Sequence, residues 1–191
     1  MPLFRLKNMG CLQSKKPTTE DLLEKRARKE SMVSRIMYEN RPDFKEEYKV
    51  IILQTWTIIA ADIARVGVVT FLRLFEMHPD VQDLFLPFRG MTQDDLKSSA
   101  RLREHGLRVM GTVEKCLARL DDPQKLEEML HELGQKHVMF NTKVDYIDLI
   151  GPTFLKVIQP ALGDKWTYKV EQAWAEFFKL ISHMMKESMV F

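Results

Sequence analysis

The sequence predicts an all-α protein in which one helical domain over residues 43–191 follows an N-terminal arm over residues 1–42. Three observations support this. Apolar residues recur every three to five positions along most of the chain, while the alternating pattern typical of strands is nearly absent. Proline, glycine and short polar residues separate these runs. With 45% apolar residues, a chain of 191 residues can bury one substantial core.

The first half of the domain contains two predicted helices and a connection. Asp43 is a candidate N-cap with Glu46 three residues later, and an apolar run with helical spacing follows. The next run, VGVVTFLRLFEM, is stopped by His78 and Pro79. The segment LFLPFRGMTQDD contains proline, glycine and several polar residues, so we expect a turn-rich connection there.

Two longer helices are predicted next. One covers roughly residues 96–120. Asp122 and Pro123 then form an N-cap followed by proline in the first turn, which predicts a second helix to about residue 140.

The C-terminal part predicts two more helices. After a break near Asn141, the run VDYIDLIGPTFLKVIQPAL has helical spacing, and we expect Gly151-Pro152 to kink or split that helix. The last helix is expected from about Asp164 and carries a broad apolar face. No internal repeat is found.

The stretch TTEDLLEKRARKESMVSRIMYEN over residues 18–40 has scattered apolar residues among many charges. A short helix is one interpretation. Because charged side chains dominate the stretch, we expect a solvated, partly frayed arm rather than an element packed on the domain.

Charge is distributed unevenly along the chain. Residues 1–40 hold nine Lys and Arg against five Asp and Glu, whereas residues 41–191 hold twenty against twenty-two. A domain that binds nucleic acid should itself be basic, so nucleic acid is not an expected partner. The basic arm is instead a candidate for contact with an anionic membrane surface.

Cysteine use and hydropathy indicate a cytoplasmic protein. Cys11 and Cys116 lie far apart and form no CxxC motif, so neither a disulfide framework nor a zinc site is expected. The most apolar stretch, residues 50–69, is interrupted by charged and polar side chains and is unlike a membrane span of about 20 apolar residues. The N-terminus also lacks the apolar run of a secretory signal.

Two histidines lie on predicted apolar stripes. His105 recurs at helical spacing with Leu102 and Val109, and His137 ends a stripe that includes Leu130 and Leu133. Either could be a core histidine satisfied by a backbone carbonyl. A metal between two facing helices would satisfy both imidazoles together, because each buried ring needs a partner. A carboxylate-rich metal site lacks its further ligands, but haem brings equatorial ligands and needs only axial imidazoles.

The remaining histidines favour structural roles. His78 precedes a proline at a helix end, and His183 lies among the charges of the last helix. His131 is six positions before His137 and therefore points in another direction. No phosphate-binding loop and no GxSxG nucleophile motif occurs, and whether the protein is an enzyme is left open.

These residues resemble the globin family over nearly all of residues 43–191. QTW resembles the opening of the family's first helix, and FLRLFEMHPDVQDLF resembles the segment that ends in the haem-stacking phenylalanine, here Phe85. LREHGLRVM resembles the distal helix with His105, and LGQKHVMF resembles the proximal stretch with His137. Within the family the spacing is most similar to the neuroglobin and globin X group.

The resemblance implies a three-on-three helical sandwich that binds haem b. His137 would be the proximal iron ligand and His105 the distal residue. The same resemblance implies further contacts to the haem, which would come from Phe71, Phe85, Arg108 (toward a propionate), Val109, Val144 and Ile147.

The resemblance also implies what the protein does. It implies reversible binding of oxygen, carbon monoxide, nitric oxide or nitrite, with iron bound by both histidines when no ligand is present. A redox, sensing or nitrite-reducing role would follow, with an unknown reductase as electron donor. The alternative from another class is a cofactor-free helical interaction module whose histidines are merely packed.

The motif MGCLQSKK over residues 9–16 resembles an acylation signal. Gly10 can be myristoylated only if translation starts at Met9, because the reaction needs a free glycine amine. Cys11 could then carry a palmitoyl group as the second signal that stable anchoring needs. Such a chain would be anchored to the cytoplasmic face of the plasma membrane, whereas an accidental motif in a plain tail is the other interpretation.

Overall fold

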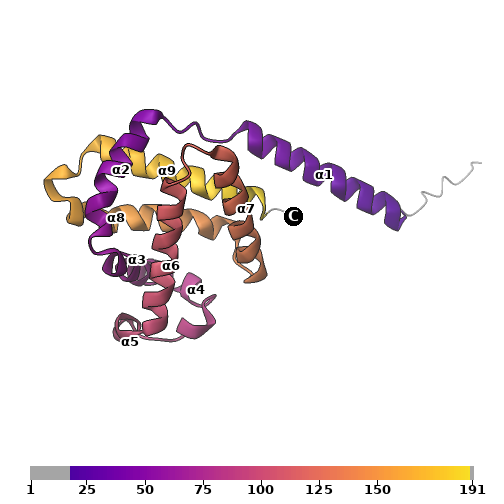
Figure 1. The fold of residues 1–191 in the computed structure, drawn as a ribbon. Coiled ribbons are helices and arrows are strands. Elements are labelled where there is room, and N and C mark those ends of the chain that lie inside the picture. Colours follow the sequence, from indigo (N-terminus) through magenta and orange to yellow (C-terminus); the bar gives the residue numbers. More distant parts are fainter. Residues whose placement is uncertain (1–17, 190–191) are drawn as a thin grey trace, which may run out of the picture.

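The computed structural model describes residues 18–189, and within that range the regular structure is entirely helical. Figure 1 shows a body of packed helices from which α1 projects. The α-helices are α1 Thr19–Glu39, α2 Glu46–Ala60, α3 Ile63–Met77, α4 Pro79–Gln82, α5 Gln93–Ser98, α6 Ala100–Leu117, α7 Pro123–Met139, α8 Ile150–Leu162 and α9 Tyr168–Glu187. Short 3₁₀ helices are η1 Leu86–Phe88, η2 Val144–Leu149 and η3 Gly163–Lys165. No described helix is long and apolar enough to cross a membrane.

The body has two layers of three helices. In one layer lie α2, α6 and α7, and in the other lie α3, α8 and α9. Across the layers α3 packs on α6, α7 packs on α9, and α2 packs on both α8 and α9. Figure 1 shows α6 crossing α8 and α9 at a steep angle. The predicted three-on-three sandwich is confirmed.

A large apolar core holds the layers together. Its centre is Trp174 on α9, whose indole contacts Trp56 and Phe154 and whose Nε1 donates a hydrogen bond of 3.0 Å to Thr55 Oγ1. Trp174 is fully buried, so this bond satisfies its one polar atom. A second apolar cluster around Phe71 and Leu102 lies under α5 and α6.

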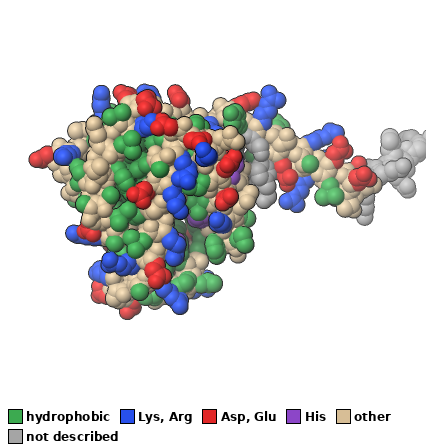
Figure 2. All heavy atoms as spheres, viewed as in Figure 1, with side chains coloured by type: hydrophobic (Ala, Val, Ile, Leu, Met, Phe, Trp, Pro, Cys, Tyr) green, Lys and Arg blue, Asp and Glu red, His purple; other side chains and the backbone are tan. Residues whose placement is uncertain are grey.

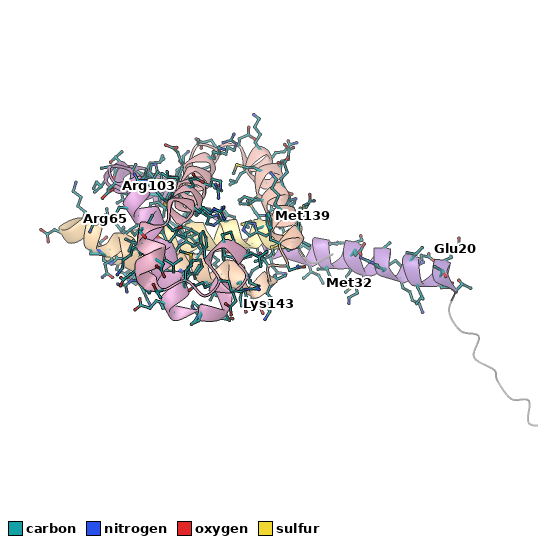
Figure 3. The ribbon with its side chains drawn as sticks, turned by 90° about the horizontal axis from the view of Figure 1, so that it is seen from below. Glu20, Met32, Arg65, Arg103, Met139 and Lys143 are labelled. Carbon is teal, nitrogen blue, oxygen red and sulfur yellow. The ribbon has the colours of Figure 1, made fainter. Side chains whose placement is uncertain are left out.

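The described part of the arm is helical, which is one of the two interpretations of its sequence. Residues 19–39 form one helix of 21 residues, which begins with a capping box between Thr18 and Asp21. Ion pairs one turn apart, such as Arg26 with Glu30, support it. Figure 2 shows acidic, basic and apolar side chains mixed along α1, and in Figure 3 Glu20 and Met32 project from it away from the body. The stretch is thus helical, and most of its residues are exposed as expected.

Several helices begin at residues other than the predicted ones. Lys45 rather than Asp43 is the N-cap of α2. The helix predicted from Leu96 is split, because the Ser99 hydroxyl accepts from Leu102 N and starts α6 anew. The last helix begins at Tyr168, after a cap by Thr167, and not near Asp164.

The helix predicted over residues 144–162 is split just before Gly151 and Pro152. They lie in the first turn of α8, where the N–H that proline lacks would have no partner within the helix. The residues before them, Val144–Leu149, form the 3₁₀ helix η2. The predicted split is therefore confirmed as a change of helix type between Leu149 and Ile150.

Candidate functional site

A close helix crossing positions His105. The backbones of α3 and α6 meet at Gly67 and Gly106, where a Cβ on either glycine would lie 2.8 Å from a backbone carbon of the other. Only glycine allows this approach. Since His105 precedes Gly106 in α6, the crossing brings its ring against the face of α3 that carries Phe71.

Two aromatic rings enclose His105. The centroid of its imidazole lies 4.7 Å from that of Phe71 and 5.2 Å from that of Phe85, and both pairs are nearly perpendicular. Phe71 and Phe85 are themselves in edge contact at 6.0 Å. The structure thus brings together three of the residues that the sequence predicts for the site.

Phe88 belongs to the same aromatic group, although sequence reasoning missed it. Its ring stacks on Phe85 at 5.9 Å and contacts Phe75 at 6.0 Å. Phe88 is buried while Phe85 is half-buried. A signal was present, because two aromatic residues three positions apart fall on one side of a 3₁₀ turn. The proline between them favoured the interpretation as a plain connection.

His105 is held as a neutral imidazole. Burial, together with the charges of Arg108 and His137, lowers its pKa to about 4. No hydrogen bond joins its ring to any residue within 18–189. At neutral pH it therefore offers a nitrogen lone pair that no described residue uses.

His137 is oriented by its own helix. Its Nδ1 lies 2.8 Å from the carbonyl oxygen of Leu133, one turn earlier in α7. A carbonyl only accepts hydrogen bonds, so Nδ1 carries the proton and the lone pair is on Nε2. This is the arrangement that fixes a histidine as a metal ligand through Nε2.

The chain turns sharply after His137. Asn141 has a positive φ of 55°, as at many helix ends, and Thr142 N donates a 3.1 Å hydrogen bond to His137 O. The turn leaves Met139 and Phe140 largely exposed, at 80% and 71%. Figure 3 shows Met139 at the outer end of α7. The break predicted near Asn141 is confirmed.

The other residues predicted to contact the haem differ in how deeply they are buried. Ile147 is buried and Val144 partly buried on η2, and Val109 packs against both apolar clusters. Arg108 is exposed and acts on His105 through its charge. Whether each of these residues touches a haem stays a prediction.

Tyr146 is a second residue that the sequence analysis did not single out. Its hydroxyl donates a hydrogen bond to the Asp80 carboxylate on α4, which lowers the pKa of Asp80. Lys143 Nζ donates to the same hydroxyl at 3.2 Å. The bond from Tyr146 to Asp80 therefore ties η2 to α4.

The remaining histidines have polar neighbours outside this site. His131 Nε2 lies 2.8 Å from a Glu187 oxygen, and His183 lies 3.6 Å from the other oxygen. His78 is at the junction of α3 and α4. The predicted acylation residues Gly10 and Cys11 lie outside the described residues.

The donor set fits a haem. One imidazole has a fixed tautomer with Nε2 unused, a second has unused ring nitrogens, and aromatic and aliphatic side chains supply an apolar wall. A porphyrin fills its own equatorial positions, so no carboxylate is required. A cavity of about 390 Å³ between α8 and α9 has no histidine in its lining.

A two-layer helical fold with two such imidazoles defines a globin-type protein. The model of the family described as Globin matches residues 69–185. The chain belongs to the globin family.

Individual relatives agree. The chain is 33% identical to a neuroglobin of Tetraodon nigroviridis over 135 residues, which are 70% of this chain and 84% of the relative. It is 29% identical to cytoglobin-2 of Danio rerio over 66% of this chain and 72% of that protein. Among solved structures, a hexacoordinated haem protein from an anhydrobiotic tardigrade superimposes with a TM-score of 0.72 at 20% identity, over 76% of this chain and 94% of that one.

Family membership settles the class of cofactor. Globins bind haem b and small diatomic ligands such as oxygen, so the chain is a haem protein. This outcome favours the haem interpretation of the two histidine stripes over a cofactor-free interaction module.

Proposed function

We propose that His137 and His105 bind the haem iron from opposite sides, so that the unliganded protein is hexacoordinate. His137 would be the proximal ligand through Nε2, and His105 the distal one. The observation that carries this proposal is that His137 Nε2 and the ring nitrogens of His105 have no hydrogen-bond partner among the described residues, while the two imidazoles lie close enough to interact electrostatically. Haem iron supplies the binding of diatomic ligands and the change of oxidation state.

The chain's residues would shape that chemistry in separate ways. The Leu133 carbonyl holds the His137 ring and makes its Nε2 more basic. Phe71 and Phe85 fix the orientation of His105 and limit the access of water to it. Arg108, exposed one turn from His105, is placed to pair with an anionic group at the surface.

We further propose that the protein has a redox or sensing role rather than a role in oxygen storage. An incoming ligand must displace His105, and its apparent affinity falls by the fraction of protein in which His105 is detached. The lowered apparent affinity makes the protein a poor store of oxygen. Electron exchange with a reductase, or reduction of nitrite, remains feasible because neither depends on tight oxygen binding.

The absorption spectrum of the reduced, unliganded protein tests the coordination. A low-spin six-coordinate ferrous spectrum is expected for the full chain, and His105→Val should convert it to a five-coordinate high-spin form. His137→Ala should lose haem or hold it loosely. His78→Ala is the matched control, because His78 lies at another helix junction. A five-coordinate wild-type spectrum refutes the bis-histidine proposal.

We also propose that a chain whose translation starts at Met9 is anchored to a membrane. The motif MGCLQSKK would then present Gly10 for myristoylation, with Cys11 and two lysines as further membrane signals. Mass spectrometry of the native N-terminus tests this. A myristoyl group on Gly10 is expected, with Gly10→Ala as the control, and an unmodified start at Met1 contradicts it.

A further inference from the structure

A polar cluster lies apart from the haem residues, where α7, α9 and the residues after α1 meet. The Glu187 carboxylate is its centre and is only 6% exposed. Its oxygens accept hydrogen bonds of 2.7 and 2.9 Å from Arg41 Nη2, and His131 Nε2 lies 2.8 Å from Oε2. A buried carboxylate with a guanidinium and an imidazole is a strongly polar site inside an otherwise apolar contact.

Glu127 completes the cluster from α7. Its Oε2 accepts a 2.7 Å hydrogen bond from Arg41 Nη1, and its Oε1 lies 4.0 Å from His131 Nε2. Glu127 and His131 are four positions apart, so both face α9 from the same side of α7. One imidazole nitrogen and one oxygen from each carboxylate lie within 4.8 Å of one another.

The charges of the cluster do not balance. Two carboxylates face one guanidinium, which leaves a net charge of −1 while His131 and His183, which lies 3.6 Å from the other Glu187 oxygen, are both uncharged. The hydrogen bond from Arg41 lowers the pKa of Glu127, so that carboxylate is ionised at neutral pH. A divalent cation in place of the guanidinium would neutralise both carboxylates.

We propose that Glu127, His131 and Glu187 form a second metal site, independent of the haem, which takes a divalent cation of the zinc class in competition with the Arg41 guanidinium. One imidazole and two carboxylates are a ligand set that zinc accepts, with water as the fourth ligand. Calcium and magnesium prefer oxygen ligands alone, so they should not compete.

The geometry allows this with small movements. Tetrahedral ligands about 2.0–2.1 Å from zinc lie roughly 3.3 Å apart, so the widest separation must shrink by on the order of 1.5 Å. Glu127 is 30% exposed, and its carboxylate can rotate toward the other two once Arg41 is displaced. The neutral His131 ring binds the metal through Nε2 after its one ring proton moves from Nε2 to Nδ1.

A bound metal and the ion pairs that attach Arg41 to α7 and α9 exclude each other at this site. Arg41 also stacks over the ring of Tyr38, at 4.8 Å, in the last turn of α1. When a cation takes the carboxylates, the guanidinium loses its ion pairs with α7 and α9. Zinc should therefore loosen the attachment of α1 to the body.

Equilibrium dialysis of the haem-loaded full chain against zinc tests the proposal, with Cys11→Ser as the background to remove one thiol. One zinc per chain beyond the haem iron is expected. His131→Ala should weaken zinc binding at least tenfold, and Arg41→Gln should strengthen it by about tenfold because the competing cation is gone. His78→Ala and Glu132→Gln, an exposed position on α7, are matched controls and should leave the affinity unchanged.

Two further measurements separate this site from other zinc binding. The zinc X-ray absorption spectrum should show nitrogen and oxygen ligands with imidazole scattering, and a sulfur ligand would contradict the proposal. The melting temperature of Arg41→Gln should rise with zinc and not with magnesium, provided the Soret band shows that haem is retained. If Arg41→Gln binds no zinc, the cluster is an ion-pair network only and the proposal is wrong.

Discussion

His105 is neutral because its ring packs against Phe71 and Phe85 and is largely removed from water. Neutrality matters for the proposed role, since a protonated imidazole has no lone pair for iron. The nearby positive charge of Arg108 acts in the same direction as burial. Two independent features of the sequence, the apolar stripe and the basic neighbour, thus favour one protonation state.

The lowered pKa of His105 predicts a pH dependence for the haem-free protein. Between pH 6.5 and about 4 the unfolded chain binds a proton at His105 that the folded chain does not. The free energy of unfolding should therefore fall as pH falls through this window, by about 3 kcal/mol at its lower end. Above pH 6.5 this contribution vanishes because both states are neutral.

Urea unfolding of haem-free wild type and His105→Leu at several pH values measures this effect. Other groups titrate in both proteins, so the difference between the two unfolding free energies isolates His105. Wild type should lose stability relative to the variant as pH is lowered from 6.5 to 4. A difference that stays constant over this range contradicts the prediction.

Cys116 predicts an unreactive thiol. It is fully buried on α6, and burial raises its pKa to about 12. The thiolate that attacks thiol reagents is therefore almost absent at pH 8. In a Cys11→Ser background the native protein should not react with a chromogenic disulfide reagent, whereas the urea-unfolded protein should release one equivalent. Rapid reaction of the native protein would show that α6 opens locally.

At the scale of elements, the crossing of α3 and α6 sets the position of the distal histidine. Gly106→Ala places a methyl group 2.8 Å from the backbone of Gly67, and neither helix backbone can yield without moving the other. We expect a loss of about 1–3 kcal/mol of stability from this overpacking. The shift should also detach His105 and raise the five-coordinate fraction in the ferrous spectrum.

Gly111→Ala is the matched control on the same helix. A Cβ at Gly111 meets nothing within 4 Å, so the higher helix propensity of alanine should stabilise the protein by about 0.5–1 kcal/mol. Thermal melting and the ferrous spectrum of both variants provide the comparison. If the two alanines behave alike, close packing at Gly106 does not position His105.

The sequence predicts the type and order of the long helices well, because their apolar stripes follow directly from what they bury. Helix ends were predicted less well. Asp43 offers a plausible capping side chain, yet α2 begins after Lys45, and the hydroxyl of Ser99 restarts a helix that periodicity alone reads as continuous. Local patterns do not rank competing caps of similar strength.

In the candidate site, too, some features could be predicted from local sequence patterns and others could not. His105 and His137 are each visible as an imidazole on an apolar stripe. The Leu133 hydrogen bond follows from helical spacing once His137 is suspected. The bond from Tyr146 to Asp80 joins residues 66 positions apart, and the bond from Arg41 to Glu187 spans 146 positions. Pairings of that kind depend on tertiary packing and leave no trace in local spacing.

At the scale of the whole molecule, the arm is attached to the body through few residues. Most of α1 is exposed, whereas Arg41 directly after it is 17% exposed and pairs with carboxylates on α7 and α9. We therefore expect the residues that stabilise the helical domain to begin close to Arg41. The predicted division of the chain at residue 42 places this arginine with the arm.

Two truncations that differ only around Arg41 make this testable. A chain of Met followed by residues 40–191 keeps the guanidinium on Glu187 and should retain nearly the full stability of the whole protein. A chain of Met followed by residues 42–191 leaves the buried Glu187 beside the imidazoles of His131 and His183 but without a guanidinium, and should lose about 2–4 kcal/mol. Urea unfolding of both haem-loaded proteins, with the Soret band as a control for cofactor content, provides the measurement. Equal stabilities would mean that Arg41 contributes little to the body and that its carboxylate partners are satisfied without it.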